Sequence, residues 1–110
     1  MGPRADLSNS TLTDENLADA DLSIADLSNA DLVGATLTGT DLTLAELVDA
    51  DMNLADLTDA NLSHANLTRA NLTNTNLRRA NLSGANLRDV QGMTPAQIRA
   101  VAITDATTKF

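Results

Sequence analysis

The chain of 110 residues lacks several residue types on which many domains depend. It has no cysteine, tryptophan or tyrosine, and its single aromatic residue is Phe110. Without cysteine, the chain has no disulfide framework, no thiol nucleophile and no Cys-based metal site. The core of this protein must therefore be built from aliphatic side chains.

Long apolar runs are missing as well. Residues 1–12 contain no apolar stretch of the kind found in signal peptides, and no segment stays apolar over the roughly 20 residues that a bilayer-spanning helix needs. We therefore expect a single domain with no membrane contact, located in the cytoplasm.

The formal net charge of −8 is unevenly distributed. Residues 1–60 carry one arginine against thirteen acidic residues, a net charge of −12, whereas residues 61–110 carry six basic residues against two acidic ones, a net charge of +4. If the two halves stack along one axis, the molecule has a dipole that orients its encounters with a partner or with a second copy.

Leucine recurs at every fifth position from Leu7 to Leu87, with Met52 as the one replacement. A small residue, usually alanine, stands two positions before most of these leucines, and Asp or Asn stands between the two. A helix would rotate successive leucines by about 140°, and a flat strand would place them on alternate faces. Neither element explains the period, so the chain must turn every five residues.

An extended segment points residues that are two apart in the same direction, so each alanine and its leucine face inward together. The Asp, Asn, Ser, Thr and Gly residues between these pairs support bends. Repeated bends wind a coil around a leucine core, and stacked coils pair their backbone groups with one another. The sequence therefore predicts a narrow solenoid.

The pattern A-(D/N)-L-x-x, from Ala5-Asp6-Leu7 to Ala85-Asn86-Leu87, resembles the pentapeptide repeat family. The resemblance implies an all-β solenoid, a right-handed quadrilateral β-helix in which four pentapeptides form one coil and residues twenty apart stack. We expect residues 1–4 to be a leader, residues 5–90 to form the β-helix, and residues 91–110 to form a C-terminal helix cap and tail.

The segment Thr94-Pro95-Ala96-Gln97 predicts a helix from Pro95 to Val101, because it combines a capping box with proline at the first helical position. Met93 and Ile98 are spaced as a hydrophobic staple, and Ile98 and Val101 share a helical face. We expect this short helix to cover the end of the leucine core. The alternative is that Met93, Ile98 and Val101 contact a second copy, because members of the resembled family are often reported to pair at their C-terminal ends.

No constellation of residues predicts catalysis, a cofactor site or a metal site. His64 is the single histidine, and the expected stacking places it outward between Leu44 and Gly84, which can neither bind a metal nor relay a proton. The Asp and Asn column is expected to stabilise bends rather than bind calcium, because Asn replaces Asp throughout the second half. We do not expect an enzyme.

Two classes of function remain. The first is a non-enzymatic protein-interaction or structural module, in which Ile24 and Leu44 point outward and stack as part of a contact. The second follows from the resemblance, because some members of the family imitate duplex DNA and bind DNA gyrase or topoisomerase in its place. The outward carboxylates that fit such a surface form three acidic columns, namely Asp6-Asp26-Glu46, Asp31-Asp51 and Asp21-Asp41.

The short rod, its basic second half and the lack of inserted loops favour the first class. We therefore expect a protein partner, with DNA gyrase as the alternative partner. Direct binding to nucleic acid is not expected, and the chain is expected to be a monomer or a homodimer.

Overall fold

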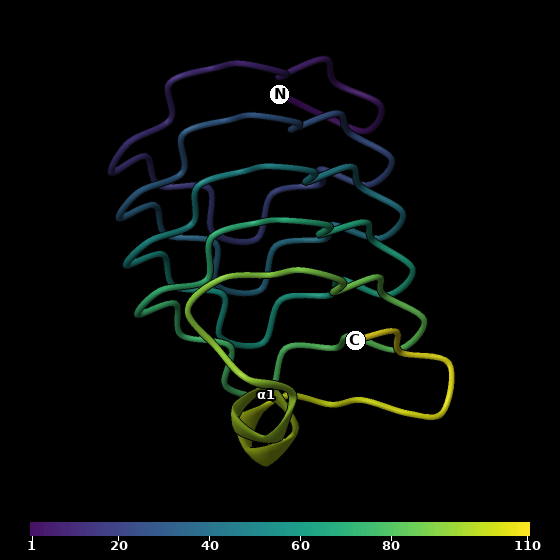
Figure 1. Cartoon of the computed structure of the whole chain (residues 1–110). Helices are drawn as coiled ribbons and strands as arrows, with labels where there is room; N and C mark the ends of the chain where they lie inside the picture. Colours follow the sequence, from purple (N-terminus) through teal and green to yellow (C-terminus); the bar gives the residue numbers. More distant parts are fainter.

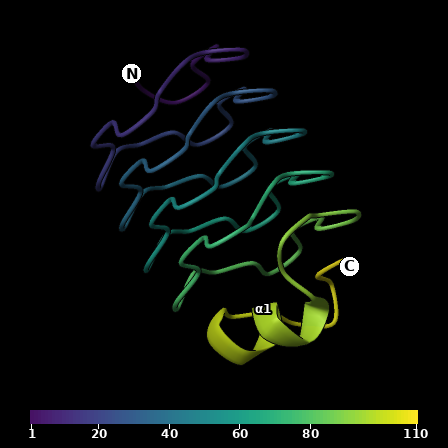
Figure 2. The same cartoon turned by 60° about the vertical axis from the view of Figure 1, so that its left-hand side comes forward.

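The computed structural model describes all 110 residues as a rod of 31 × 22 × 21 Å. The coils stack along the rod, with the N-terminus at one end and a single helix at the other (Figures 1 and 2). Each coil takes twenty residues, because every parallel bridge from Asp6↔Asp26 to Asn71↔Gln91 joins residues twenty apart. The fold is the predicted all-β solenoid, a right-handed quadrilateral β-helix.

Each side of a coil contributes a single-residue parallel bridge rather than a long strand. The amide of Leu27 donates to the carbonyl of Glu46 in the next coil at 2.7 Å, and the amide of Asp26 donates to Ala5 in the preceding coil at 2.9 Å. The same pair of bonds recurs at most sides along the rod. A lone coil would leave these backbone groups unpaired, so the coils depend on their neighbours.

A tight turn follows each core leucine. The amide of Ala25 donates to the carbonyl of Leu22 at 3.1 Å, and the third residue of each turn has a φ near +60° while the second does not, as in a type II turn. Before the turn, Oδ1 of Asp21 accepts a hydrogen bond from the amide of Ser23 at 3.1 Å. Asn side chains in the second half accept the same bond. The predicted bend-stabilising arrangement of the Asp and Asn column is confirmed.

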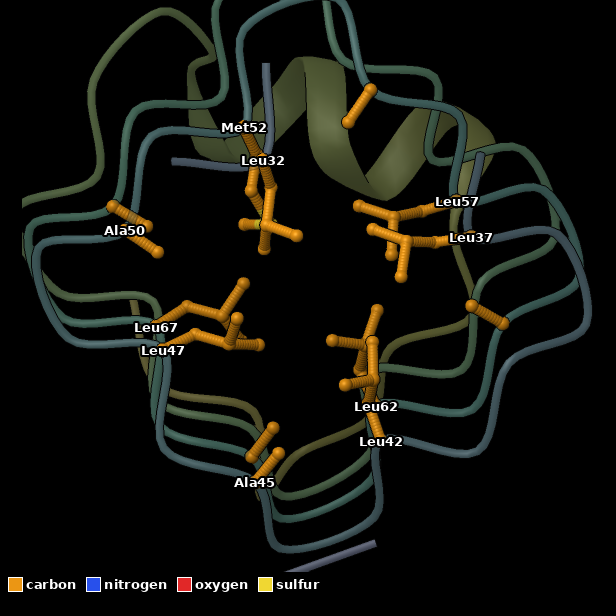
Figure 3. Packing of buried hydrophobic residues seen from close by; sticks show 14 of the residues in the cluster. Leu32, Leu37, Leu42, Ala45, Leu47, Ala50, Met52, Leu57, Leu62 and Leu67 are labelled. Atoms are coloured by element: carbon orange, nitrogen blue, oxygen red, sulfur yellow. The ribbon is translucent and has the colours of Figure 1, made fainter. Parts of the chain in front are cut away.

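The core is a stack of aliphatic side chains that converge from four sides (Figure 3). Leu32 and Met52 come from the side of the coil opposite Leu42 and Leu62 (Figure 3), and all four side chains are fully buried. Buried alanines fill most of the corners between turn and core. Thr40 takes one alanine position and donates its hydroxyl to a carbonyl of the preceding coil at 2.7 Å.

The helix α1 spans Pro95–Val101, the bounds that the sequence predicts. The amide of Gln97 donates to Oγ1 of Thr94 at 3.2 Å, and the amide of Thr94 donates to Oε1 of Gln97 at 2.9 Å, so both bonds of the capping box form. Ile98 is fully buried against the last coil. With seven residues, α1 is too short to cross a membrane.

After α1 the chain rejoins the solenoid, which the sequence did not predict. Ile103 pairs with Asn81 and Lys109 pairs with Asn86, each as a further parallel bridge. Thr108 is buried and donates its hydroxyl to the carbonyl of Leu82 at 2.9 Å. The tail therefore supplies two sides of the last coil, and α1 takes the place of another.

Leu54 and Leu57 allow the contributions of a surface side chain and a core side chain to folding stability to be compared. Leu57→Ala should lower the free energy of unfolding by about 2–5 kcal/mol, because Leu57 is fully buried between two coils. Leu54→Ala should change it by less than about 0.5 kcal/mol, because Leu54 is 60% exposed. Urea denaturation of both variants measures the difference, and equal losses would contradict the four-sided core.

Candidate functional site

Three aliphatic side chains point outward at turns, namely Ile24, Leu44 and Leu54, which are 43%, 51% and 60% exposed. Ile24 and Leu44 are twenty residues apart and lie on neighbouring coils, joined where the amide of Ile24 donates to the carbonyl of Thr43 at 2.8 Å. We name this pair the apolar ridge. Leu54 lies half a coil further along the chain, at the diagonally opposite corner, and stands alone.

The apolar ridge occupies backbone positions that disfavour its own residues. Ile24 and Leu44 both have a φ of 60°, in the left-handed region. Gly, Asn or Asp fills eleven of the eighteen equivalent turn positions, because these residues adopt this conformation most readily. For other residues this backbone conformation costs about 1–2 kcal/mol. A β-branched residue such as isoleucine rarely adopts it at all. The ridge therefore costs folding stability.

Four carboxylates flank the apolar ridge on the same two coils. Asp21 and Asp41 form a bridge on one adjoining side, and Asp26 and Glu46 form a bridge on the other. Asp41 is half-buried, and the other three are exposed. The hydroxyl and the amide of Ser23 both donate to Asp21 and lower the pKa of its carboxyl group. We call these four residues the flanking carboxylates.

The structure forms the two separate pairs Asp21–Asp41 and Asp31–Asp51 that the twenty-residue stacking predicts, and it places them on opposite sides of the coil. Asp31 and Asp51 bridge each other on the side that carries Leu32, opposite the side of Asp21 and Asp41. Sequence analysis placed Asp26 and Glu46 in an acidic column but did not connect that column with the apolar ridge. The twenty-residue stacking contained that signal, because Asp26 follows Ile24, and Glu46 follows Leu44, by two residues.

Two ion pairs neutralise turn positions further along the rod. Arg69 binds Asp49 through two hydrogen bonds of 2.9 and 3.2 Å, and Arg79 binds Asp59 through two of 2.7 and 3.2 Å. Hydrogen bonds from each guanidinium lower the pKa of its partner carboxyl group. Arg99 lies over the ring of Phe110, with Cζ 4.3 Å from the ring centroid. Of the remaining basic residues, Arg4 lies at the N-terminal end of the rod, and Arg78, Arg88 and Lys109 lie in its C-terminal half.

The remaining candidates fall at the cap and at His64. Met93 and Val101 line a hollow of about 430 Å³ between α1 and the turn at Asn74, whereas Ile98 is buried in the core. The contact with a second copy stays a prediction, and only Met93 and Val101 of the three residues reach the surface for it. His64 is exposed and its ring lies against Gly84, so the predicted stacking of these two residues is confirmed.

The chain is similar in sequence and structure to known proteins. The family model described as pentapeptide repeats matches in 8 copies over residues 4–39, 20–59 and 55–90. One similar solved structure is HetL, a pentapeptide repeat protein involved in heterocyst differentiation regulation from the cyanobacterium Nostoc sp. strain PCC 7120. Its sequence is 36% identical to this chain and the TM-score is 0.56, and the alignment covers 80% of this chain and 39% of HetL. No curated protein matches the chain by sequence.

Two further solved structures are similar. Rfr23, a pentapeptide repeat protein from the cyanobacterium Cyanothece 51142, is 39% identical with a TM-score of 0.52, covering 98% of this chain and 62% of Rfr23. A pentapeptide repeat protein from the Arabidopsis thaliana thylakoid lumen is 32% identical with a TM-score of 0.60, covering 100% of this chain and 84% of that protein. The chain thus spans about two fifths of the length of HetL and about three fifths of that of Rfr23.

Replacing the apolar ridge should stabilise the protein. In the double variant Ile24→Asn/Leu44→Asn, we expect the free energy of unfolding to rise by about 0.5–1 kcal/mol per substitution, because asparagine tolerates a positive φ. The variant Ile24→Ala/Leu44→Ala keeps a Cβ atom at both positions and should gain less. Urea denaturation measures both, and a loss of stability in the asparagine variant would mean that the ridge packs favourably on the rod.

The ion pair Arg69–Asp49 should be visible in the titration of Asp49. Its folded-state pKa lies below the ordinary value of an aspartate carboxyl group. The small, solvent-screened contribution of the pair to stability is therefore full above that ordinary value and is lost as the pH falls through the folded pKa. In Arg69→Gln the pKa of Asp49 should rise, while that of Asp59, still paired with Arg79, should stay lowered. Carboxyl NMR titration measures both groups, and an unchanged Asp49 would show that the pair does not form in solution.

Proposed function

The chain belongs to the pentapeptide repeat family, and we propose that it acts as a non-enzymatic protein-interaction module whose docking surface is the apolar ridge. One observation carries the proposal. Ile24 and Leu44 stand exposed on neighbouring coils, at turn positions where a large apolar side chain costs stability. A residue that weakens the fold and stays exposed contributes nothing to the free rod.

A partner would give these side chains their role. Scattered exposed apolar residues are ordinary in soluble proteins, but here two of them adjoin at strained positions. Covering apolar surface gains about 25 cal/mol per Å² removed from water. A partner that covers the ridge therefore recovers part of the free energy that the two turns cost in the folded chain.

The backbone around the ridge is held firmly before any partner arrives. The amide of Leu44 donates to the carbonyl of Ser63 at 3.0 Å, and the amide of Ala45 donates to Leu42 at 3.0 Å, so the turn is tied both to itself and to the next coil. Ile24 is held in the same way. A surface ordered in advance loses little conformational entropy on binding, which favours the affinity of a small contact.

We rank the DNA-mimicking alternative, with DNA gyrase as partner, second. Its acidic columns are short, because Asp41 stacks on Asn61 and Asp51 stacks on Asn71. One oxygen of each aspartate in these columns also accepts a hydrogen bond from its own turn. A row of phosphates along duplex DNA continues in both directions, whereas these two rows stop after two carboxylates and the row Asp6-Asp26-Glu46 stops after three, where Glu46 stacks on Asn66.

Photo-cross-linking in the cells that make the protein tests the proposed docking surface. A photoreactive side chain at position 44 should give a cross-linked protein adduct that disappears when Ile24→Asn is added, because the partner covers both residues. The matched control carries the same side chain at position 54, where Leu54 is at least as exposed as Leu44 and has a similar positive φ but has no apolar neighbour on the adjacent coil. Equal adducts at positions 44 and 54, or none at either, would overturn the proposal.

A further inference from the structure

We propose that the apolar ridge receives a cationic amphipathic segment, one with an apolar stripe bordered on both sides by lysine or arginine. This inference rests on the proposed function, since it names the chemistry of the partner at the same surface. It is carried by the position of the flanking carboxylates, which lie on both sides of Ile24 and Leu44 and on the same two coils.

None of the flanking carboxylates is paired with a cation. The two ion pairs of the structure join Arg69 to Asp49 and Arg79 to Asp59, at other corners of the rod. Oδ1 of Asp21, Asp26 and Asp41 accepts bonds from the residue two positions on, which leaves the second oxygen of each free. The side-chain carboxylate of Glu46 makes no hydrogen bond within the chain, and Glu46 is exposed.

These charges restrict what can cover the ridge. A partner broad enough to bury Ile24 and Leu44 also removes water from the carboxylates beside them, and burying an unpaired carboxylate is costly. An uncharged apolar surface would pay that cost, whereas cations on both flanks would offset it and add charge-assisted hydrogen bonds. Charge complementarity therefore selects the cationic partner over the neutral one.

The distribution of charge along the whole rod also favours a cationic partner at the ridge. The ridge lies in residues 1–60, which carry a net charge of −12, and the C-terminal half carries +4. Arg4, one coil before Ile24, is the single basic residue of the acidic half. A cationic segment is thus drawn to the end of the rod that carries the ridge.

A symmetric contact with a second copy would oppose four carboxylates to four carboxylates, so we do not expect self-association through this surface.

Three labelled peptides of equal length with the same leucine stripe provide the test, with Lys, Gln or Glu bordering the stripe. Fluorescence anisotropy should show the Lys peptide binding at least about tenfold more tightly than the Gln peptide, with the Glu peptide weakest. Raising the salt from about 20 to about 150 mM should weaken binding of the Lys peptide, because the flanking charges are exposed.

Three variants assign the binding to the surface. Ile24→Asn/Leu44→Asn should lose binding of the Lys peptide, and Asp26→Asn/Glu46→Gln should weaken it about tenfold. The control Asp14→Asn/Asp19→Asn removes the same number of charges from two other corners and should leave binding nearly unchanged. Because the asparagine variant of the ridge is expected to be more stable than the parent, a loss of binding there cannot come from unfolding.

The possible failures are distinguishable. If the Gln peptide binds as tightly as the Lys peptide and both require the ridge, the docking surface stands and the cationic partner is wrong. If the Lys peptide binds the ridge variant as well as the parent, general charge attraction explains the binding and the inference fails. If sedimentation shows dimers that the ridge variant lacks, the occupant is a second copy. If no peptide binds and position 44 gives no cross-link, both proposals fail.

Discussion

Hydrogen bonding between successive coils is the interaction on which the rest of this structure depends. Each side of a coil pairs through its backbone with the coils before and after it, so no coil is stable alone. This pairing fixes the twenty-residue repeat, which in turn aligns the leucines into a continuous core (Figure 3) and the outward residues into columns. The apolar ridge and its flanking carboxylates are such columns, so the same bonds that build the rod position its candidate site.

Most of the fold could be predicted from the sequence because its determinants are local and periodic. The five-residue leucine spacing excludes helix and strand, and the capping box at Thr94 fixes the start of α1. The return of Ile103 and Lys109 to the last coil could not be predicted, because these residues lie six apart, off the five-residue period. Only the structure shows that the tail after α1, which lacks the five-residue repeat, completes the last coil.

The candidate site was only partly predictable. The exposure and stacking of Ile24 and Leu44 follow from the period, but the left-handed conformation of both residues becomes meaningful only once the turn geometry is known. The stacking of Asp21 on Asp41 and of Asp31 on Asp51 was likewise predictable, but the sequence did not show that Asp26 and Glu46 are the carboxylates that flank the ridge on its second side. In a solenoid, the side on which a charge lies matters more than the number of charges in the chain.

The turn that Asp and Asn stabilise has a consequence for how such a surface can evolve. The fold uses one oxygen atom, Oδ1, which aspartate and asparagine both provide, and their amide contacts have similar lengths in both halves of the rod. Exchanging one residue for the other changes the charge of that point by one unit and leaves the turn intact. Natural selection can therefore change the distribution of surface charge on the rod, one position at a time, while the turns and the stability of the fold are kept.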